Sequence, residues 1–176
     1  MLKVALLSDT HGHLDDAIFK YFDDCDEIWH AGDFGTIEVA QKLAALKPLR
    51  GVYGNIDGTS IREKFSENLF LEIENMRVLI THIAGSPDKF TPRVKRLIAE
   101  KKPQLLICGH SHILKVLRVP EFDLMYMNPG AAGNEGFHKM KTLLRFTIDS
   151  GSLKNLQVVE LGKRGFSALN KTEANR

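Results

Sequence analysis

Apolar residues follow two different spacings along the first part of the chain. They are continuous in some short runs, which is typical of buried strands, and recur every three or four positions in others, which predicts helices. Pro48 lies just beyond the second such helix as a stop signal. The expected elements are strands at 3–7, 27–29 and 49–53, and helices at 14–22 and 36–46.

Strands dominate the second part of the chain. The runs at 69–73 and 77–80, joined at 74–76, predict a hairpin. A helix over 94–98 is stopped by Pro103. Further strands are expected at 105–108, 114–119, 124–127, 143–148 and 156–161, with no helix between the last four. An alternating order followed by a run of strands predicts an α/β protein with two sheets and helices outside them.

Composition places the chain among ordinary globular proteins. Its 176 residues suit one domain, and 24 basic against 22 acidic residues give a net charge of only +2. These values argue against a disordered chain and against a strongly basic nucleic-acid binder. No apolar run approaches the roughly 20 residues that span a bilayer. The two cysteines are too few for a disulfide framework, so we expect a cytoplasmic protein. We expect a domain over 1–162 and a polar tail over 163–176.

Metal-ligand residue types stand where the expected strands end. Glycine accompanies most of them and lets the backbone approach a bound ion closely. Because ligands of open sheets collect at the carboxyl ends of strands, these five segments are expected to converge. They are Asp9-Thr10-His11-Gly12, His30-Ala31-Gly32-Asp33, Gly54-Asn55, Thr81-His82 and Gly109-His110-Ser111-His112.

Seven such ligands suit two divalent cations that share one carboxylate and clamp a phosphoryl group. Imidazole with carboxylate and amide oxygens favours Mn, Fe, Zn or Ni over Ca. Asp33 fits the shared position because an anionic oxygen best suits the space between two cations. Single motifs have simpler interpretations: Asp9 and Asn55 are also typical of turns, and His30 beside Trp29 is expected to be a structural histidine.

These five motifs, in this order, resemble those of the calcineurin-like metallophosphoesterases, over residues 2 to 148. The length and Asn128-Pro129-Gly130 resemble the small bacterial YfcE-type phosphodiesterases. The resemblance implies a two-sheet β-sandwich flanked by helices, in four αββα layers. It implies a first metal bound by Asp9, His11, Asp33 and His112, and a second bound by Asp33, Asn55, His82 and His110. Mn is the expected metal, with Zn, Fe or Ni as alternatives. A metal-bridging water would be the nucleophile, the substrate a small phosphoester, and the protein a dimer or larger oligomer.

The chain departs from the resembled pattern at two points. Ile56-Asp57 follows Asn55, where larger members have Asn-His-Glu or Asn-His-Asp. Ile83-Ala84 follows His82, where many YfcE-type relatives read Thr-His-Gly-His. The histidine that protonates the leaving group is therefore missing at position 56. His13 and His138, both in loops next to glycine, are the candidate catalytic replacements.

Three functions remain open from the sequence. The first is a metal-dependent phosphodiesterase. The second is a non-catalytic interaction scaffold, as in the retromer subunit that resembles these enzymes, and the third is a phosphate-binding module. The loop with Gly130, Gly133 and Gly136 is either a plain turn or a set of backbone amides for phosphate. The basic residues Arg93, Lys95 and Arg96 are expected to form a solvated helix face, and no membrane or specific nucleic-acid partner is expected.

Overall fold

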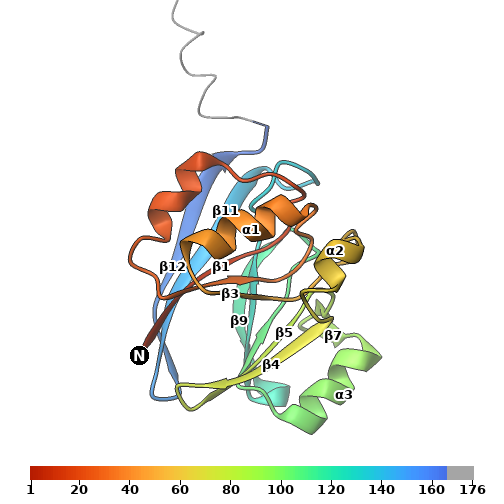
Figure 1. Cartoon of the computed structure of the whole chain (residues 1–176). Coiled ribbons are helices and arrows are strands. Elements are labelled where there is room, and N and C mark those ends of the chain that lie inside the picture. The colour runs from red at the N-terminus through yellow and green to blue at the C-terminus, as the bar shows by residue number, and fades with distance from the viewer. Residues whose placement is uncertain (166–176) are drawn as a thin grey trace, which may run out of the picture.

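The computed structural model describes residues 1–165, in which two five-stranded sheets pack face to face (Figure 1). Across the first sheet the strands are β12 (Ser152–Lys163), β11 (Met140–Asp149), β1 (Leu2–Leu7), β2 (Glu27–His30) and β3 (Leu49–Gly51). Across the second they are β4 (Asn68–Ile73), β5 (Met76–Thr81), β8 (Leu105–Ile107), β10 (Leu124–Pro129) and β9 (Leu114–Val119). Both sheets are mixed. Strands β1, β2 and β3 are parallel neighbours, as are β5, β8 and β10, whereas β11, β12, β4 and β9 pair antiparallel with their neighbours.

Helices and short elements connect these strands. The α-helices are α1 (Ile37–Leu46), α2 (Thr59–Arg62) and α3 (Pro92–Lys101). Two 3₁₀ helices, η1 (Asp16–Tyr21) and η2 (Pro120–Phe122), and the strand pair β6 (Gly85–Ser86) and β7 (Lys89–Phe90) complete the order. The longest amphipathic helix of the second half begins at Pro92, where Thr91 caps it by accepting a hydrogen bond from the Val94 amide.

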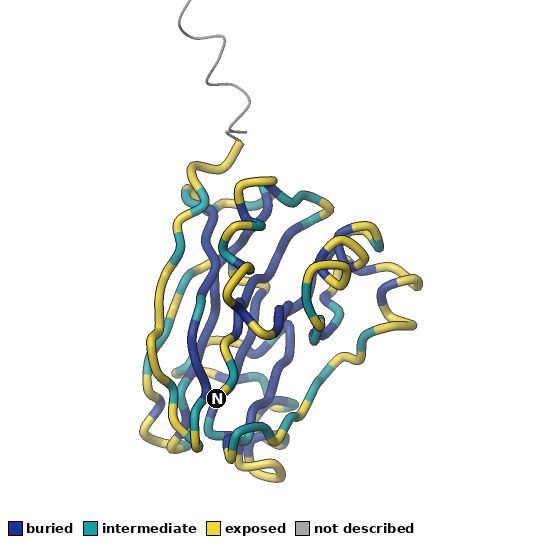
Figure 2. The backbone as a smooth tube through the Cα atoms, turned by 60° about the vertical axis from the view of Figure 1, so that its left-hand side comes forward, coloured by how far each residue is buried: buried dark blue, intermediate teal, exposed yellow. Residues whose placement is uncertain are grey.

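The core is layered because side chains of a strand alternate between its two faces. In β1, Val4 and Leu6 face the second sheet, whereas Ala5 and Leu7 pack outward with residues of η1 and α1. The outer face of the second sheet is covered in the same way by α3. Trp29, fully buried between the sheets, makes an edge contact with the ring of Phe146. Figure 2 shows the inner strands as continuous buried segments, and the structure thus confirms the sandwich flanked by helices.

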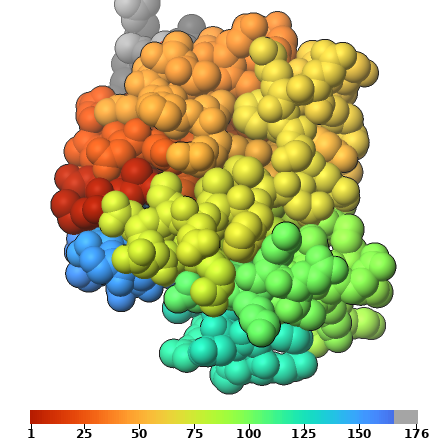
Figure 3. Space-filling model, turned by 60° about the horizontal axis from the view of Figure 1, so that its bottom comes forward, coloured from red at the N-terminus to blue at the C-terminus, as the bar shows by residue number. Residues whose placement is uncertain are grey.

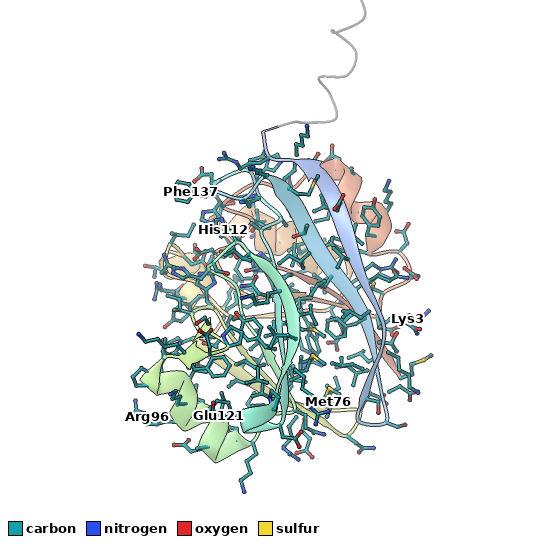
Figure 4. All side chains as sticks on the ribbon, turned by 180° about the vertical axis from the view of Figure 1, so that it is seen from behind. Lys3, Met76, Arg96, His112, Glu121 and Phe137 are labelled. Carbon is teal, nitrogen blue, oxygen red and sulfur yellow. The ribbon has the colours of Figure 1, made fainter. Side chains whose placement is uncertain are left out.

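The two ends of the sandwich differ in chemistry. At one end the β4–β5 turn meets the β11–β12 turn, where the amide of Gly151 donates to the carbonyl of Glu74 at 2.6 Å (Figure 3). At the other end lie the carboxyl ends of β1, β2, β3, β5 and β8, which the parallel pairings gather at one edge of each sheet. Figure 4 places His112 at this second end and Met76 at the first.

Several expected elements change their bounds or type. The expected helix over 14–22 is the 3₁₀ helix η1, because the amides of Ile18 and Phe22 bond carbonyls only three residues back. The expected strand over 156–161 is the middle of the longer β12. Helix α2 and the β6–β7 pair were not predicted, since they are too short for a periodic pattern.

The hairpin expected at 74–76 is confirmed, with Glu74 and Asn75 both at positive φ in the turn. Both cysteines, Cys25 and Cys108, are buried. No helix within residues 1–165 has the length and apolarity that crossing a bilayer requires. Lys163, the first residue of the predicted polar tail, is the last residue of β12. Residues 166–176 of that tail lie outside the described residues.

Candidate metal centre

Two loops that follow the neighbouring strands β1 and β2 are hydrogen-bonded to each other. The amide of Asp9 donates to the carbonyl of Gly32 at 3.0 Å, and the amide of His11 donates to the carbonyl of Asp33 at 3.1 Å. The pairing of the two strands therefore continues beyond their ends. Backbone bonds thus fix three candidate ligands, Asp9, His11 and Asp33, relative to one another.

Most candidate ligands have a left-handed backbone. A positive φ, between 48° and 69°, is found at five of the seven, namely Asp9, His11, Asp33, His110 and His112. This conformation costs a residue other than glycine roughly 1–2 kcal/mol, and Asp and His adopt it more often than most residues. Such strain persists where surrounding structure enforces it, and it gathers at functional sites.

A first cluster consists of Asp9, His11 and His112, whose ligand atoms all lie within 4.8 Å of one another. His112 Nε2 is 3.2 Å from Asp9 Oδ1 and 3.3 Å from His11 Nε2. The loop at Gly136 packs directly on this cluster, because a Cβ added there would lie 2.0 Å from His112 Nδ1. The carboxylate is fully buried and both imidazoles are largely buried.

A second cluster consists of Asp33, His82 and His110, again with ligand atoms within 4.8 Å of one another. His82 Nε2 lies 3.2 Å from Asp33 Oδ2 and 3.1 Å from Asn55 Oδ1. Asn55 therefore joins this cluster. With it, the structure brings all seven sequence-predicted ligands to one end of the sandwich.

One carboxylate oxygen faces both clusters. Asp33 Oδ2 is 3.7 Å from His11 Nε2 in the first cluster and 3.2 Å from His82 Nε2 in the second. Asp9 Oδ1 also lies between the clusters, 3.2 Å from His112 Nε2 and 3.9 Å from His82 Nε2. This arrangement is the one in which a carboxylate can be shared by two cations.

The donor atoms of the two clusters suit a cation. His82 Nδ1 lies 2.8 Å from the carbonyl of Ala31, which can only accept, so Nδ1 carries the proton and Nε2 presents a lone pair. That lone pair points at the oxygens of Asp33 and Asn55. Electron-pair donors converge here, and imidazole with carboxylate and amide oxygens matches borderline divalent metals. The residues thus fit a metal centre.

The pKa shifts also indicate that the two clusters favour a positive charge. Burial lowers the pKa of His82, but a second proton, on Nε2, would be hydrogen-bonded to Asp33 and attracted by the charges of Asp9 and Asp33, and these effects outweigh burial and leave the pKa raised. Burial raises the pKa of Asp33, yet the hydrogen bond and charge of His82 outweigh that effect and leave it lowered. The buried carboxylates therefore stabilise a positive charge placed between them and the imidazoles.

The carboxylate of Asp9 is held by groups that are not ligands. Ser8 Oγ donates to Asp9 Oδ2 at 2.6 Å, and the amide of His110 lies 3.1 Å from the same oxygen. Gly109 leaves room for this arrangement, because a Cβ there would lie 2.0 Å from Ser8 Oγ. Asn128 supports the same loop through a 2.8 Å hydrogen bond from Nδ2 to the carbonyl of Gly109.

Asp57 holds the loops that carry Asp33 and Asn55. Its buried carboxylate accepts hydrogen bonds from the amides of Gly35 and Gly54, both at 2.8 Å, and from the amide of Phe34 at 3.2 Å. Sequence reasoning noted Asp57 only as a departure from a family motif and missed this role. The spacing to Gly54 was the available signal, because an Asp side chain often accepts from a nearby turn amide.

His30 is confirmed as a structural histidine. It is fully buried, and its Nδ1 accepts a hydrogen bond from the amide of Gly32 at 3.1 Å. Its Nε2 therefore carries the proton and donates to Thr10 Oγ1 at 3.0 Å. Burial lowers its pKa to about 3, so the imidazole is neutral at physiological pH. It belongs to neither cluster.

The two candidate catalytic histidines lie in different places. The ring of His138 makes an edge contact with that of His112, with centroids 5.2 Å apart, and its Nε2 lies 3.0 Å from the carbonyl of Gly133. Among residues 1–165, His138 Nδ1 is buried and has no hydrogen-bond partner. His13 instead lies beside Asp15, with 4.0 Å between the ring Nε2 of His13 and Oδ2 of Asp15. It belongs to neither cluster.

The structure favours one of the two interpretations of the glycine loop and corrects one prediction. The amides of Gly130 and Gly133 donate to Asn128 Oδ1 and to the carbonyl of Asp9, so internal acceptors use two of the three glycine amides considered for phosphate, which favours the plain turn. Arg93 is not part of a solvated helix face, because its guanidinium donates to Thr81 Oγ1 and to the carbonyl of Ile83. Lys95 and Arg96, farther along the same helix, are exposed as predicted.

Solved structures with this fold include a phosphodiesterase and Vps29. A novel archaeal phosphodiesterase superposes with a TM-score of 0.72 at 23% identity, covering 91% of this chain and all of the other. Vps29 complexed with Zn²⁺, from Entamoeba histolytica, superposes with a TM-score of 0.69 at 16% identity, covering 90% of this chain and 99% of the other. At these identities the likeness establishes the fold.

Sequence comparison is more specific. The chain is 33% identical over 133 residues to a probable metallophosphoesterase of Methanothermobacter thermautotrophicus, covering 73% of this chain and 76% of that protein. The family model of the calcineurin-like phosphoesterase superfamily domain matches residues 2–151, which contain both clusters. The chain therefore belongs to the calcineurin-like phosphoesterase superfamily.

Proposed function

We propose that this protein is a metal-dependent phosphodiesterase that binds two divalent cations, with Asp33 shared between them. The single observation that carries the proposal is the position of Asp33 Oδ2, within 3.7 Å of an imidazole nitrogen in each cluster. Asp9, His11 and His112 would complete the first ion's ligands, and Asn55, His82 and His110 the second's. This division follows the two clusters and the branch of small YfcE-type phosphodiesterases that the motifs resemble.

A bound pair of cations supplies positive charge for the phosphoryl oxygens and lowers the pKa of water so that it can attack phosphorus. Mn²⁺ is the proposed metal, because the donor set suits borderline ions and contains no thiolate. Zn²⁺ is the alternative, supported by the zinc complex of the Entamoeba histolytica neighbour. The substrate is a small phosphoester, reached from the open end of the sandwich.

The protein's own residues supply the remaining chemistry. The carbonyl of Ala31 keeps His82 in the tautomer whose Nε2 lone pair faces the second cluster. Ser8 and the amide of His110 hold the Asp9 carboxylate in one orientation. His138 Nδ1 is the proposed site of the proton that passes to the departing alkoxide, because the ring lies against His112 and this nitrogen is unpartnered among the described residues. Since Nε2 faces the carbonyl of Gly133 and carries the proton of the neutral ring, the donor is the doubly protonated ring, which becomes neutral as Nδ1 releases its proton.

The test is hydrolysis of bis(p-nitrophenyl) phosphate by protein stripped of metal and then titrated with Mn²⁺. We expect turnover to require the ion and to stop with chelator. Asp33→Asn should abolish turnover and weaken Mn²⁺ binding in calorimetry, whereas Asp23→Asn, a change at an exposed carboxylate, should alter neither. Folded protein that binds no Mn²⁺ would refute the proposal and favour the interaction scaffold. Binding of Mn²⁺ and phosphate without turnover would favour the phosphate-binding module.

The role of His138 has a separate test. Proton donation matters most when the leaving group is a poor one and contributes up to about 10²–10⁴-fold. His138→Ala should therefore slow the hydrolysis of alkyl phosphodiesters far more than that of nitrophenyl diesters. His13→Ala is the matched control and should slow both equally or not at all. Equal losses for both substrate types in His138→Ala would contradict the assignment.

A further inference from the structure

A pocket opens beside the second cluster. It has a volume of about 240 Å³, and Asn55 and His82 of the cluster form part of its wall. Tyr53, Arg62, Arg93 and Glu67 are among the other residues that line it. Sites that enclose a whole drug-sized molecule begin near 300 Å³, so this volume suits one substituent of a substrate, such as a phosphate. We call it the arginine pocket.

Neutral groups fix Arg93 in the arginine pocket. Its Nη2 donates to Thr81 Oγ1 at 3.1 Å and to the carbonyl of Ile83 at 3.0 Å, the residues on either side of His82. Its Nη1 donates to the side-chain oxygen of Asn68. Three neutral oxygens from β4, β5 and the following loop thus orient the guanidinium without cancelling its charge.

Arg62 is fixed in the same manner. Its Nε donates to the carbonyl of Asp57 at 2.6 Å, and its Nη2 donates to the carbonyl of Gly54 at 3.2 Å. The guanidinium carbon also lies 4.2 Å from the centre of the Tyr53 ring, a cation–π contact. No carboxylate of residues 1–165 lies within 4.0 Å of Arg62.

Three arginines elsewhere in the protein are paired with carboxylates instead. Arg50 binds Glu27 through two hydrogen bonds, and Arg145 and Arg118 each contact a carboxylate. Among residues 1–165, Glu67 contributes the only carboxylate that lines the arginine pocket; it is half exposed and lies 3.6 Å from Arg93 Nε. Two positive charges therefore face one negative charge. Guanidinium groups held rigidly by neutral oxygens favour an anion that can accept charge-assisted hydrogen bonds.

We propose that the arginine pocket binds a second anionic group of the substrate, so that the preferred substrates are phosphodiesters with an additional phosphate on one ester arm. The inference rests on the proposed function, because the pocket shares its wall with two ligands of the second cluster. Arg62 and Arg93 are specificity-determining residues in this assignment. They select the ester arm that lies over Asn55 and His82.

The test compares two substrates that differ by one phosphate. Thymidine 5′-(p-nitrophenyl phosphate) carries one anionic group, and its 3′-phosphorylated analogue carries a second. We expect the Mn²⁺-loaded protein to show a kcat/KM about tenfold or more higher for the analogue, the size expected of one hydrogen bond to a charged group. Arg62→Met and Arg93→Met should each lower this ratio toward 1, and Glu67→Gln should raise it.

Lys95→Met is the matched control, because Lys95 is exposed on the same helix as Arg93 and lies outside the arginine pocket. It should leave the ratio unchanged. A ratio near 1 in the wild-type protein, or a ratio that Arg62→Met leaves unchanged, would overturn the proposal. Arg62→Met keeps the test decisive where Arg93→Met is poorly folded, since Arg93 also joins β4 to β5.

A binding measurement separates this inference from the proposed function. Calorimetry should show that Mn²⁺-loaded protein binds thymidine 3′,5′-bisphosphate about tenfold more tightly than thymidine 5′-monophosphate. Arg62→Met should remove the difference. Equal affinities, or binding of neither nucleotide, would overturn the inference. Turnover of neither nitrophenyl ester would instead contradict the proposed function, while the affinities still report on the arginine pocket.

Discussion

Asp57→Asn tests whether a carboxylate that is not a metal ligand organises the metal centre. The wild-type side chain accepts from Gly35 with Oδ1 and from Phe34 and Gly54 with Oδ2. Asparagine keeps one acceptor oxygen. If that oxygen faces Phe34 and Gly54, the NH₂ group of the asparagine faces the Gly35 amide and one hydrogen bond is lost. In the flipped orientation the NH₂ group faces Phe34 and Gly54, and two hydrogen bonds are lost.

The expected loss of stability follows from these contacts. One hydrogen bond to a charged group contributes about 1.5–3 kcal/mol, and the bonds that remain become weaker because their acceptor is neutral. We therefore expect Asp57→Asn to lower the free energy of unfolding by about 3 kcal/mol. Because the amide of Ile56 donates to Asp33 Oδ1 from the same loop, Mn²⁺ affinity should also fall, by about 10–100-fold.

Urea unfolding in chelator measures the stability, and calorimetric titration of the folded variant with Mn²⁺ measures the affinity. Asp23→Asn makes the same chemical change at an exposed site and should shift the free energy of unfolding by less than about 0.5 kcal/mol. A variant of Asp57 that keeps both the wild-type stability and the wild-type Mn²⁺ affinity would refute the reasoning.

Two further predictions concern backbone space and pH. Gly136→Ala should weaken Mn²⁺ binding at least about tenfold, because its Cβ would lie 2.0 Å from His112 Nδ1. Gly162→Ala is the control, since Gly162 shares the positive φ but its Cβ would meet no atom within 4 Å. Unchanged Mn²⁺ affinity in both variants would contradict the predicted effect of the contact. Burial raises the pKa of Glu27, but hydrogen bonds from Arg50 and Trp29 leave it below its ordinary value of 4.5. Such a carboxylate stabilises the fold above pH 4.5 and loses that contribution as the pH falls through its lowered pKa. Urea unfolding should therefore show a stability advantage over Glu27→Gln at pH 6 that shrinks by pH 3, and an advantage that grows on acidification would contradict this sign.

Hydrophobic spacing predicted two sheets with helices outside them, and the polar residues at the strand ends predicted the end at which the site lies. Strands such as β8, expected at 105–108, match because a continuous apolar run indicates burial on both faces of a sheet. The type of η1 was missed because apolar spacing does not distinguish three-residue from four-residue hydrogen bonds. Arg93 was missed for another reason, since its partners Asn68 and Thr81 are distant in sequence and carry no charge pattern.

The same limit applies within the candidate site. Strand ends predicted which seven side chains converge, because parallel strands bring their carboxyl ends to one edge. The sequence could not predict which imidazole nitrogen faces which carboxylate. That orientation depends on single backbone groups, such as the carbonyl of Ala31 beside His82. For Asp57 the spacing to Gly54 indicates only a turn, and its hydrogen bonds from the distant amides of Phe34 and Gly35 leave no signal in the sequence.

The candidate ligands come from both sheets: Asp9, His11 and Asp33 follow strands of the first, and His82 and His110 follow strands of the second. An ion held between them acts as a clamp that a half-folded chain cannot form. Resistance to denaturation should consequently track the supply of metal, rising by about 1.4 kcal/mol for each tenfold excess of free ion over its dissociation constant. Metal starvation would then lower not only turnover but also the lifetime of the folded molecule.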